Sequence, residues 1–244
     1  MKIVVAKNYE ELSLQAANKV ADIVKSKQDV VLGLPTGSTP LGMYKDLIDM
    51  NKEGKLSFKD VTTFNLDEYE SLPKEDENSY YRFMWDNFFS HIDIDRQRTN
   101  IPNGMASNVE EECKDYERRI EDVGGIDLMV LGIGNNGHIG FNEPSSYFAG
   151  ATHRVKLHEN TIEANSRFFG SLDKVPKHAV TMGIKSIMQC RSVMILASGK
   201  GKADAIKKAL EGPITPELPA SVLQLHRDLT VIVDEEAASL LEKR

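Results

Sequence analysis

The stretch Ile126-Asp-Leu-Met-Val-Leu-Gly-Ile-Gly-Asn-Asn-Gly-His-Ile-Gly-Phe-Asn-Glu-Pro144 joins an apolar run directly to a glycine-rich loop. Residues 126–133 are almost continuously apolar, which is typical of a parallel strand that is covered on both faces. Ligands bind beyond the carboxyl ends of such strands. The loop therefore places the imidazole of His138 and the carboxylate of Glu143 where a ligand would lie.

The rest of the chain alternates between strand and helix patterns. Capping residues precede three expected helices: Asn8 with Glu11, Asn108 with Glu111, and Asp234 before two glutamates. The sequence therefore predicts an α/β fold with a mainly parallel sheet and helices on both faces. The expected strands are the short β-branched runs at 2–5, 29–34, 61–66, 126–133, 178–182, 192–197 and 229–233.

The chain shows no internal division. It contains neither a repeat nor a Pro/Gly/Ser-rich linker, so we expect one domain over residues 1–244. Residues 142–157 are less regular and are expected to form a lid or an added hairpin. The proline-rich stretch 212–219 is expected to be a surface connection.

Composition narrows the class of protein. The 244 residues are 41% hydrophobic and 27% charged, as in ordinary soluble globular proteins. The net charge of -7 disfavours nonspecific binding of nucleic acid. Cys113 and Cys190 have neither metal-ligand spacing nor a disulfide framework, which favours a reducing compartment. No signal peptide precedes the first strand, and no apolar run approaches the ~20 residues of a membrane span. We expect a cytoplasmic protein.

A candidate phosphate site follows the second expected strand. Asp29-Val-Val-Leu-Gly-Leu-Pro-Thr-Gly-Ser-Thr-Pro40 runs into a helical pattern that begins at Leu41. Backbone N–H groups at a helix start are unpaired and lie at the positive end of the helix dipole, so Gly37, Ser38 and Thr39 could bind a phosphate. The segment matches no nucleotide-binding motif. By itself it leaves phosphate binding and ordinary helix capping equally open.

A carboxylate pair ends the third expected strand, in Val61-Thr-Thr-Phe-Asn-Leu-Asp-Glu-Tyr69. Such a pair is either a solvated strand end or a base held at the ligand crevice. Asp67 is the better candidate for a base because it lies at the strand tip, whereas alternation turns Glu68 away.

His138 is surrounded by glycines after a buried strand and can exchange a proton near neutral pH. Glu143 could orient it or stabilise the imidazolium. A metal bound by His138, Glu143 and Asp67 is a weaker hypothesis because the spacing matches no metal motif. A serine hydrolase lacks its G-x-S-x-G turn.

Two cations in the second half could hold a phosphate: Arg167, and Lys202 at the turn after the strand 192–197. A lone Arg or Lys more often lies on a solvated helix face.

Together these segments resemble the glucosamine-6-phosphate deaminase family, also called glucosamine-6-phosphate isomerase, over essentially the whole chain. The matching segments, in family order, are Leu32-Gly-Leu-Pro-Thr-Gly-Ser-Thr-Pro40, Asn65-Leu-Asp-Glu-Tyr69, Leu131-Gly-Ile-Gly-Asn-Asn-Gly-His-Ile-Gly-Phe-Asn-Glu-Pro144, Ala164-Asn-Ser-Arg-Phe-Phe169 and Ser198-Gly-Lys-Gly-Lys202. The resemblance implies a modified Rossmann-like domain. It also implies conversion of D-glucosamine 6-phosphate and water to D-fructose 6-phosphate and ammonia, in N-acetylglucosamine catabolism.

The resemblance further implies roles for individual residues. Asp67 would be the base that moves a proton between C2 and C1, and His138 the acid and base of ring opening, supported by Glu143 and Asn136. Many relatives carry Asp in place of Asn136, and an amide cannot stabilise an imidazolium by charge. The 6-phosphate would be bound by the loop at Gly37 and Ser38, with Arg167 and Lys202. The chemistry requires neither a metal nor another cofactor.

Two alternative functions remain. A 6-phosphogluconolactonase shares the fold and a similar glycine-rich loop, but the segments Phe141-Asn-Glu-Pro144 and 65–69 resemble the deaminase. A sugar-phosphate-sensing regulator would need a DNA-binding segment, for which the first strand, starting at Lys2, leaves no room. The expected partner is a small sugar phosphate, with neither nucleic acid nor membrane, and a homo-oligomer is left open.

The resemblance also bears on regulation. Longer relatives are activated by N-acetylglucosamine 6-phosphate through basic residues shortly after the Asn-Glu-Pro segment. Counted back from Ala164 without a gap, this chain has His153 and Val155 at those positions. We therefore expect hyperbolic kinetics without this activation.

Overall fold

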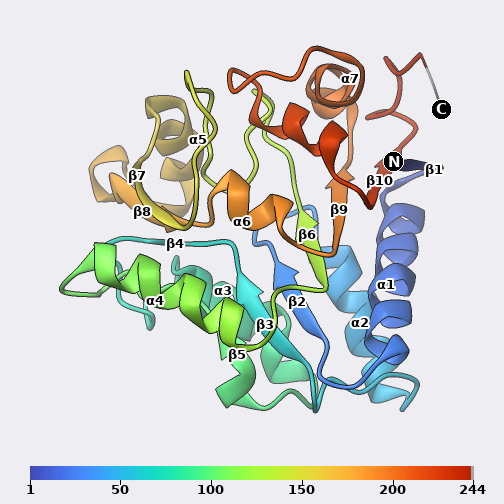
Figure 1. Cartoon of the computed structure of the whole chain (residues 1–244), viewed down its shortest axis with the longest axis horizontal. Helices are drawn as coiled ribbons and strands as arrows, with labels where there is room; N and C mark the ends of the chain where they lie inside the picture. Colours follow the sequence, from blue (N-terminus) through green and yellow to red (C-terminus); the bar gives the residue numbers. More distant parts are fainter. Residues whose placement is uncertain (243–244) are drawn as a thin grey trace.

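The computed structural model describes residues 1–242, without the side chains at positions 160, 164, 165, 167 and 168. Within that range, seven parallel strands form the central sheet, in the spatial order β1-β10-β9-β6-β2-β3-β5 (Figure 1). In this order the strands are β1 (Lys2–Ala6), β10 (Leu229–Asp234), β9 (Ser192–Ala197), β6 (Leu128–Leu131), β2 (Val31–Leu34), β3 (Thr62–Asn65) and β5 (Thr99–Asn100). The predicted α/β fold with a mainly parallel sheet is confirmed.

Both faces of the sheet are covered, as the apolar run at 126–133 predicted. Successive side chains of a strand point to opposite faces. Leu128 and Val130 of β6 accordingly pack into one core, and Met129 and Leu131 pack into the other. Because all four are buried, the strand reads as a continuous apolar run rather than as an alternating one.

Helices α1, α2 and α3 supply side chains to the core that contains Leu128 and Val130. Helices α4, α6 and α7 supply side chains to the core on the other face. Their bounds are α1 (Tyr9–Ser26), α2 (Leu41–Lys52), α3 (Tyr80–Asn87), α4 (Val109–Asp122), α6 (Ile184–Met188) and α7 (Ala203–Glu211). Short 3-10 helices complete the connections: η1 (Phe89–His91), η2 (Arg96–Arg98), η3 (Leu172–Lys174), η4 (Lys200–Lys202) and η5 (Pro219–Leu225).

A second, antiparallel sheet differs from the prediction. The run at 178–182 was expected in the parallel sheet, but β8 (His178–Thr181) pairs instead with β4 (Asp67–Tyr69) and β7 (His153–Lys156). This sheet lies with α5 (Glu159–Phe169) at the left of Figure 1. Residues 142–157 form an irregular loop followed by β7, so the expected hairpin within that segment is wrong. Pairing between distant segments leaves no local signal, which explains both differences.

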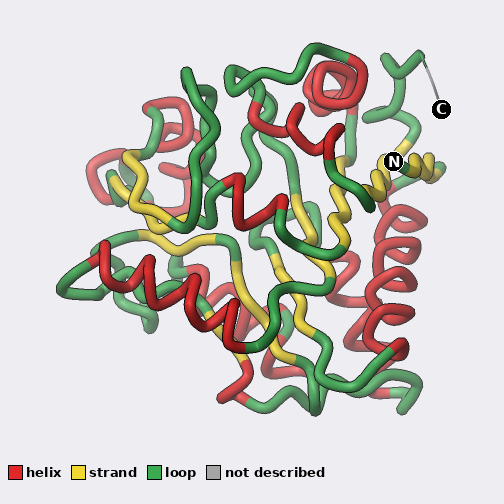
Figure 2. The backbone as a smooth tube through the Cα atoms, in the orientation of Figure 1, coloured by secondary structure: helices red, strands yellow, loops and turns green. Residues whose placement is uncertain are grey.

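The strand order reverses between β2 and β6. The chain continues from β2 outward through β3 to β5, and from β6 in the opposite direction through β9 to β10. Such a reversal opens a crevice at the carboxyl ends of the strands. The loops 35–40 and 132–140 leave β2 and β6 at this point, and Figure 2 shows loops in green beyond the upper strand ends.

Two of the three predicted caps are confirmed. The side chain of Asn8 accepts from Glu11 N at 2.9 Å, and Asn108 accepts from Glu111 N at 3.2 Å. Asp234 also accepts from Ala237 N at 2.8 Å, but residues 235–240 form turns instead of the expected helix.

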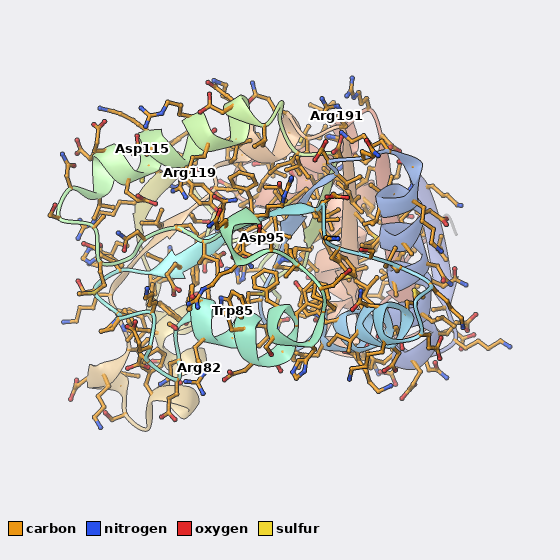
Figure 3. All side chains as sticks on the ribbon, turned by 90° about the horizontal axis from the view of Figure 1, so that it is seen from below. Arg82, Trp85, Asp95, Asp115, Arg119 and Arg191 are labelled. Atoms are coloured by element: carbon orange, nitrogen blue, oxygen red, sulfur yellow. The ribbon has the colours of Figure 1, made fainter. Side chains whose placement is uncertain are left out.

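At the opposite, amino-terminal ends of the strands, a buried carboxylate links neighbouring segments. Asp127 accepts from the backbone of Val31 at 2.8 Å and pairs with Lys27 at 2.8 Å and Arg191 at 3.1 Å. Figure 3 shows the molecule from below, with Arg191 labelled. These contacts stabilise the fold, whereas the candidate site lies at the carboxyl ends of the strands.

Candidate active site

A cavity of about 640 Å³ lies at the point where the strand order reverses. Its walls come from loop 35–40 after β2, from the glycine-rich loop after β6, and from single residues of more distant elements. Most of the residues proposed from sequence line it: Gly37, Ser38, Thr39, Asp67, Asn136, His138 and Lys202. Glu143 lies behind His138 rather than in the wall. A cavity of this volume can hold a sugar phosphate.

Loop 35–40 has the geometry of an anion site. Gly37 adopts a φ of +93°, which L side chains rarely adopt, and α2 begins at Leu41. Within the described part of the chain, the backbone N–H groups of Gly37, Ser38 and Thr39 donate to no protein acceptor. They are therefore free for a ligand at the positive end of α2.

Tyr9 of α1 holds this loop from behind, and sequence reasoning missed it. Its hydroxyl lies 3.1 Å from the carbonyl oxygen of Ser38 and 3.0 Å from that of Thr39. It also accepts from Gly42 N at 2.8 Å. The loop carbonyls are thus engaged by Tyr9. A tyrosine at the start of an expected amphipathic helix gives no signal of this contact.

Lys202 brings a cation to the cavity from η4, directly after β9. It is half-buried, and burial lowers the pKa of its ammonium. Among the described residues no carboxylate pairs with it. A cation that is partly desolvated without a partner favours an anionic ligand.

Arg167 lies on α5, but its side chain is outside the described residues. Its proposed contact with phosphate therefore stays a prediction from sequence.

Asp67 lies at the start of β4, just past the end of β3, and reaches the cavity from a dry environment. It is only 7% exposed. Burial, together with the charge of neighbouring Glu68, raises the pKa of Asp67 to about 8. The alternative interpretation of this pair as a solvated strand end is wrong, because the carboxylates of Asp67 and Glu68 are both buried. A carboxylate with a raised pKa is a stronger base when ionised.

His138, Asn136 and Glu143 form a chain of hydrogen bonds beside the cavity. Asn136 Nδ2 donates to Glu143 Oε2 at 2.6 Å, and Asn136 Oδ1 lies 2.7 Å from His138 Nδ1. Glu143 Oε2 is also 3.4 Å from His138 Nδ1. Gly134 makes room for the imidazole, because a Cβ there would collide with the ring.

The hydrogen bonds between Glu143, Asn136 and His138 select one tautomer of the imidazole. Glu143 as a carboxylate can only accept, so the amide nitrogen of Asn136 must face it and the amide oxygen must face His138. Nδ1 is therefore the donor, and in a neutral imidazole Nε2 carries the lone pair. The geometry thus prepares Nε2 to accept a proton.

Glu143 is ionised at neutral pH. Burial by itself would raise its pKa, but the hydrogen bond and charge of His138, with hydrogen bonds from Thr161 and Asn136, together lower it to about 2. His138 therefore has a negatively charged neighbour in Glu143, although residue 136 is an uncharged amide. The hydrogen bond of Asn136 orients the imidazole, and Glu143 provides the charge that stabilises its protonated form.

Sequence reasoning also missed two residues in the wall, Thr161 and Tyr80. Thr161 of α5 donates to Glu143 Oε1 at 2.6 Å. Tyr80 of α3 stacks on Phe141, with ring centroids 6.0 Å apart. Both come from elements whose position depends on tertiary packing, so no local pattern reveals them.

The proline-rich stretch 212–219 does more than connect surface elements. Leu218 packs against Gly137, whose φ is +84°, and Ala220 N donates to Gly137 O at 2.9 Å. The loop that carries His138 is therefore supported from behind by this segment.

Residues 1–242 contain no group of His, Cys, Asp and Glu side chains arranged to hold a metal ion. Over the same range, no helix is both long and apolar enough to cross a bilayer.

Residues 6–232 match the family described as glucosamine-6-phosphate isomerases/6-phosphogluconolactonase. The chain belongs to this family. The resemblance found in the sequence is thereby confirmed.

Two curated members of the family match almost the whole chain. A glucosamine-6-phosphate deaminase of Clostridium botulinum (strain Langeland) is 56% identical over 242 residues, which cover 99% of each chain. The deaminase of Clostridium perfringens (strain ATCC 13124) is 54% identical over 242 residues, covering 99% of this chain and 100% of its own.

Solved structures agree with the fold. A monomeric glucosamine-6-phosphate deaminase superposes with a TM-score of 0.95 at 51% identity, covering 98% of this chain and 100% of that one. The 6-phosphogluconolactonase of Trypanosoma cruzi gives a TM-score of 0.78 at 22% identity, covering 99% and 97%. The second likeness shows a shared fold alone.

Proposed function

We propose that the protein converts D-glucosamine 6-phosphate and water to D-fructose 6-phosphate and ammonia, as a cytoplasmic enzyme of N-acetylglucosamine catabolism. The full-length relatives at 54–56% identity are glucosamine-6-phosphate deaminases, which supports this activity. The whole chain, residues 1–244, would form one catalytic domain. Two buried free cysteines accord with a reducing compartment.

One observation carries the proposal. A buried carboxylate, Asp67, and an oriented imidazole, His138, line the same cavity as an open helix N-terminus and a lysine that pairs with no carboxylate of the described residues. This combination provides an anion site for the phosphate and two different proton carriers for the sugar. An aldose-ketose isomerisation needs both.

Substrate binding begins with the phosphate. The N–H groups of Gly37, Ser38 and Thr39 would donate to its oxygens, and Lys202 would supply a positive charge. Arg167 would add a second cation. Fixing the phosphate places the amino sugar against the opposite proton carriers and reduces its freedom before chemistry begins.

Ring opening would then use His138. Nε2 accepts the proton from the O1 hydroxyl of the pyranose and returns a proton to O5 as the C1–O5 bond breaks. Glu143, anionic because its pKa is about 2, stabilises the imidazolium that forms between these two transfers. The result is the open-chain aldehyde.

Isomerisation would use Asp67. The carboxylate removes the proton from C2 and delivers it to C1, while one proton passes from the amino nitrogen to O1, so the amino aldehyde becomes a ketone-level imine at C2 with a hydroxyl at C1. Water then adds to that imine carbon, and ammonia leaves. The products are D-fructose 6-phosphate and ammonia, and Asp67 is again a carboxylate.

A substrate panel tests this function. The purified protein is given glucosamine 6-phosphate, its N-acetyl form and 6-phosphogluconolactone, while ammonia, fructose 6-phosphate and acid release are followed separately. We expect ammonia and fructose 6-phosphate in equal amounts from the first substrate alone. Lactone hydrolysis without ammonia would favour the 6-phosphogluconolactonase alternative, and binding without turnover would favour a sensing domain.

The homo-oligomer left open by the sequence stays a prediction. The structural relative at 51% identity is a monomer. Sedimentation velocity at several protein concentrations decides between the two states.

A further inference from the structure

Glu68 is a buried carboxylate that the proposed reaction does not use. It follows Asp67 directly, is only 3% exposed, and lies outside the cavity wall. Three backbone N–H groups donate to it. Oε1 accepts from Tyr69 N at 2.8 Å and from Tyr80 N at 3.0 Å, and Oε2 accepts from Tyr81 N at 2.9 Å. A buried acid with this many donors has a definite position and orientation.

Two of these donors belong to the first turn of α3. The side chain of Ser79 caps the helix by accepting from Arg82 N at 3.0 Å, which leaves the N–H groups of Tyr80 and Tyr81 to be satisfied. Glu68 accepts both and, when it is ionised, places a negative charge at the positive end of the helix dipole. Strand β4 and helix α3 are thereby joined through one side chain.

The join matters because Tyr80 forms part of the cavity wall. Its ring stacks on Phe141 at an interplanar angle of 11°, and its hydroxyl lies 3.3 Å from that of Tyr69. If α3 moved relative to β4, Tyr80 would move relative to Asp67. The carboxylate of Glu68 therefore contacts the helix that carries a wall residue, and it is adjacent in sequence to the proposed base.

We propose that Glu68 is a positioning residue of this site: it fastens α3 to β4, so that Tyr80 closes the cavity, and it keeps a negative charge next to Asp67. The proposal rests on the proposed function, in which Asp67 is the base that must be ionised.

The surroundings of Asp67 make this charge influential. The phenols that face it, Tyr69, Tyr80 and Tyr116, are uncharged near neutral pH because burial raises their pKa values. Among the described side chains, the other ionisable groups in the cavity wall are those of His138 and Lys202. Burial raises the pKa of Glu68 to about 7, still below that of Asp67, so Glu68 is ionised first and its like charge disfavours ionisation of Asp67. Removing the charge should let Asp67 ionise at a lower pH.

The test is the pH profile of kcat/KM for ammonia release from glucosamine 6-phosphate. In the wild-type enzyme the rising limb follows ionisation of Asp67. In Glu68→Gln we expect that limb to move down by about one pH unit, since the like charge is gone. We also expect kcat to fall, because the new amide N–H would face the N–H of Tyr81.

Glu70→Gln is the matched control. Glu70 lies two residues further along and pairs with Arg154 at 2.6 Å, away from α3. Its substitution should leave the limb in place. A Glu68→Gln limb within experimental error of the wild type would overturn the proposal, even if the variant is slow or less stable.

If Glu68→Gln does not fold, a second variant, Glu68→Asp, is measured in its place. Glu68→Asp keeps the charge but is too short to reach all three N–H groups. We expect its limb near the wild-type position and its kcat at least tenfold lower. Wild-type kcat and limb in Glu68→Asp would overturn the proposal. A wild-type protein that releases no ammonia would instead contradict the proposed function itself.

Discussion

Asn136 Oδ1 lies 2.7 Å from Nδ1 of His138, and this contact determines which ring nitrogen can accept a proton. The orientation of the amide follows from its other end, where Nδ2 donates to Glu143 at 2.6 Å. Asn136 therefore transmits the acceptor character of a carboxylate to the imidazole. An aspartate at this position would accept from Nδ1 equally well, but it would place a second negative charge against Glu143.

The first prediction concerns ring opening. In His138→Gln the side chain has no titrating nitrogen, so proton transfer between O1 and O5 must be left to water. We expect kcat for the cyclic substrate to fall at least a hundredfold, and an open-chain analogue to be affected much less. The ratio of the two rates is the measurement. An equal loss with both compounds would show that His138 does not act in ring opening.

The second prediction concerns stability and pH. Burial and the charge of Glu68 raise the pKa of Asp67 to about 8, against ~3.9 in an unfolded chain. The unfolded chain thus loses this proton near pH 4, whereas the folded protein retains it until about pH 8. The contribution of Asp67 to stability therefore falls as the pH rises through that window.

Asp67→Asn removes this titration. Its free energy of unfolding, measured by urea titration, should exceed that of the wild type by an amount that grows from pH 4 to 8. The gain should then become constant, at about 2 to 5 kcal/mol. A difference that is independent of pH would mean that Asp67 is ionised in the folded protein throughout.

The third prediction concerns the phosphate. Lys202→Ala removes a cation that lines the cavity, which should weaken substrate binding by about 1.5 to 3 kcal/mol. KM for glucosamine 6-phosphate should rise with kcat changed less, and inorganic phosphate should inhibit more weakly. Lys200→Ala is the control, since Lys200 is exposed and lies outside the cavity wall. If the two variants behave alike, Lys202 does not bind the phosphate.

The fourth prediction concerns regulation. On β7, His153 and Val155 are half-buried, whereas Arg154 and Lys156 are exposed, and Arg154 already pairs with Glu70. The resemblance, counted back from Ala164 without a gap, implies that positions 153 and 155 are those at which the longer, activated relatives carry cations. We expect hyperbolic kinetics that N-acetylglucosamine 6-phosphate does not change. A sigmoidal rate curve that becomes hyperbolic with this compound would contradict the prediction.

The sequence predicted the parts of the structure that depend on local patterns. The apolar run before His138, the strand that ends just before Asp67 and the helix start after Gly37 each carry their signal in adjacent residues. The parallel sheet brings them together at the carboxyl ends of its strands. The turns after Asp234 show the limit of such signals, because a capping residue does not by itself continue a helix.

The parts that were missed depend on contacts between distant segments. Tyr9 forms a hydrogen bond with loop 35–40 at a residue 30 positions away in the sequence, and Thr161 forms one with Glu143, 18 positions away. Strand β8 has the composition of a central strand, yet it pairs antiparallel with β4 and β7. Such contacts are determined by packing, which no single segment encodes.

Turnover by Asp67→Asn is the measurement that tests the central claim most directly, because the amide keeps the shape of the side chain but cannot accept the C2 proton. Ammonia release from glucosamine 6-phosphate is compared with the wild type, and affinity for fructose 6-phosphate is measured in parallel to show that the cavity is intact. We predict that turnover is almost abolished while product affinity stays within about threefold of the wild type. Near-normal turnover with normal affinity would contradict the assignment of Asp67 as the base.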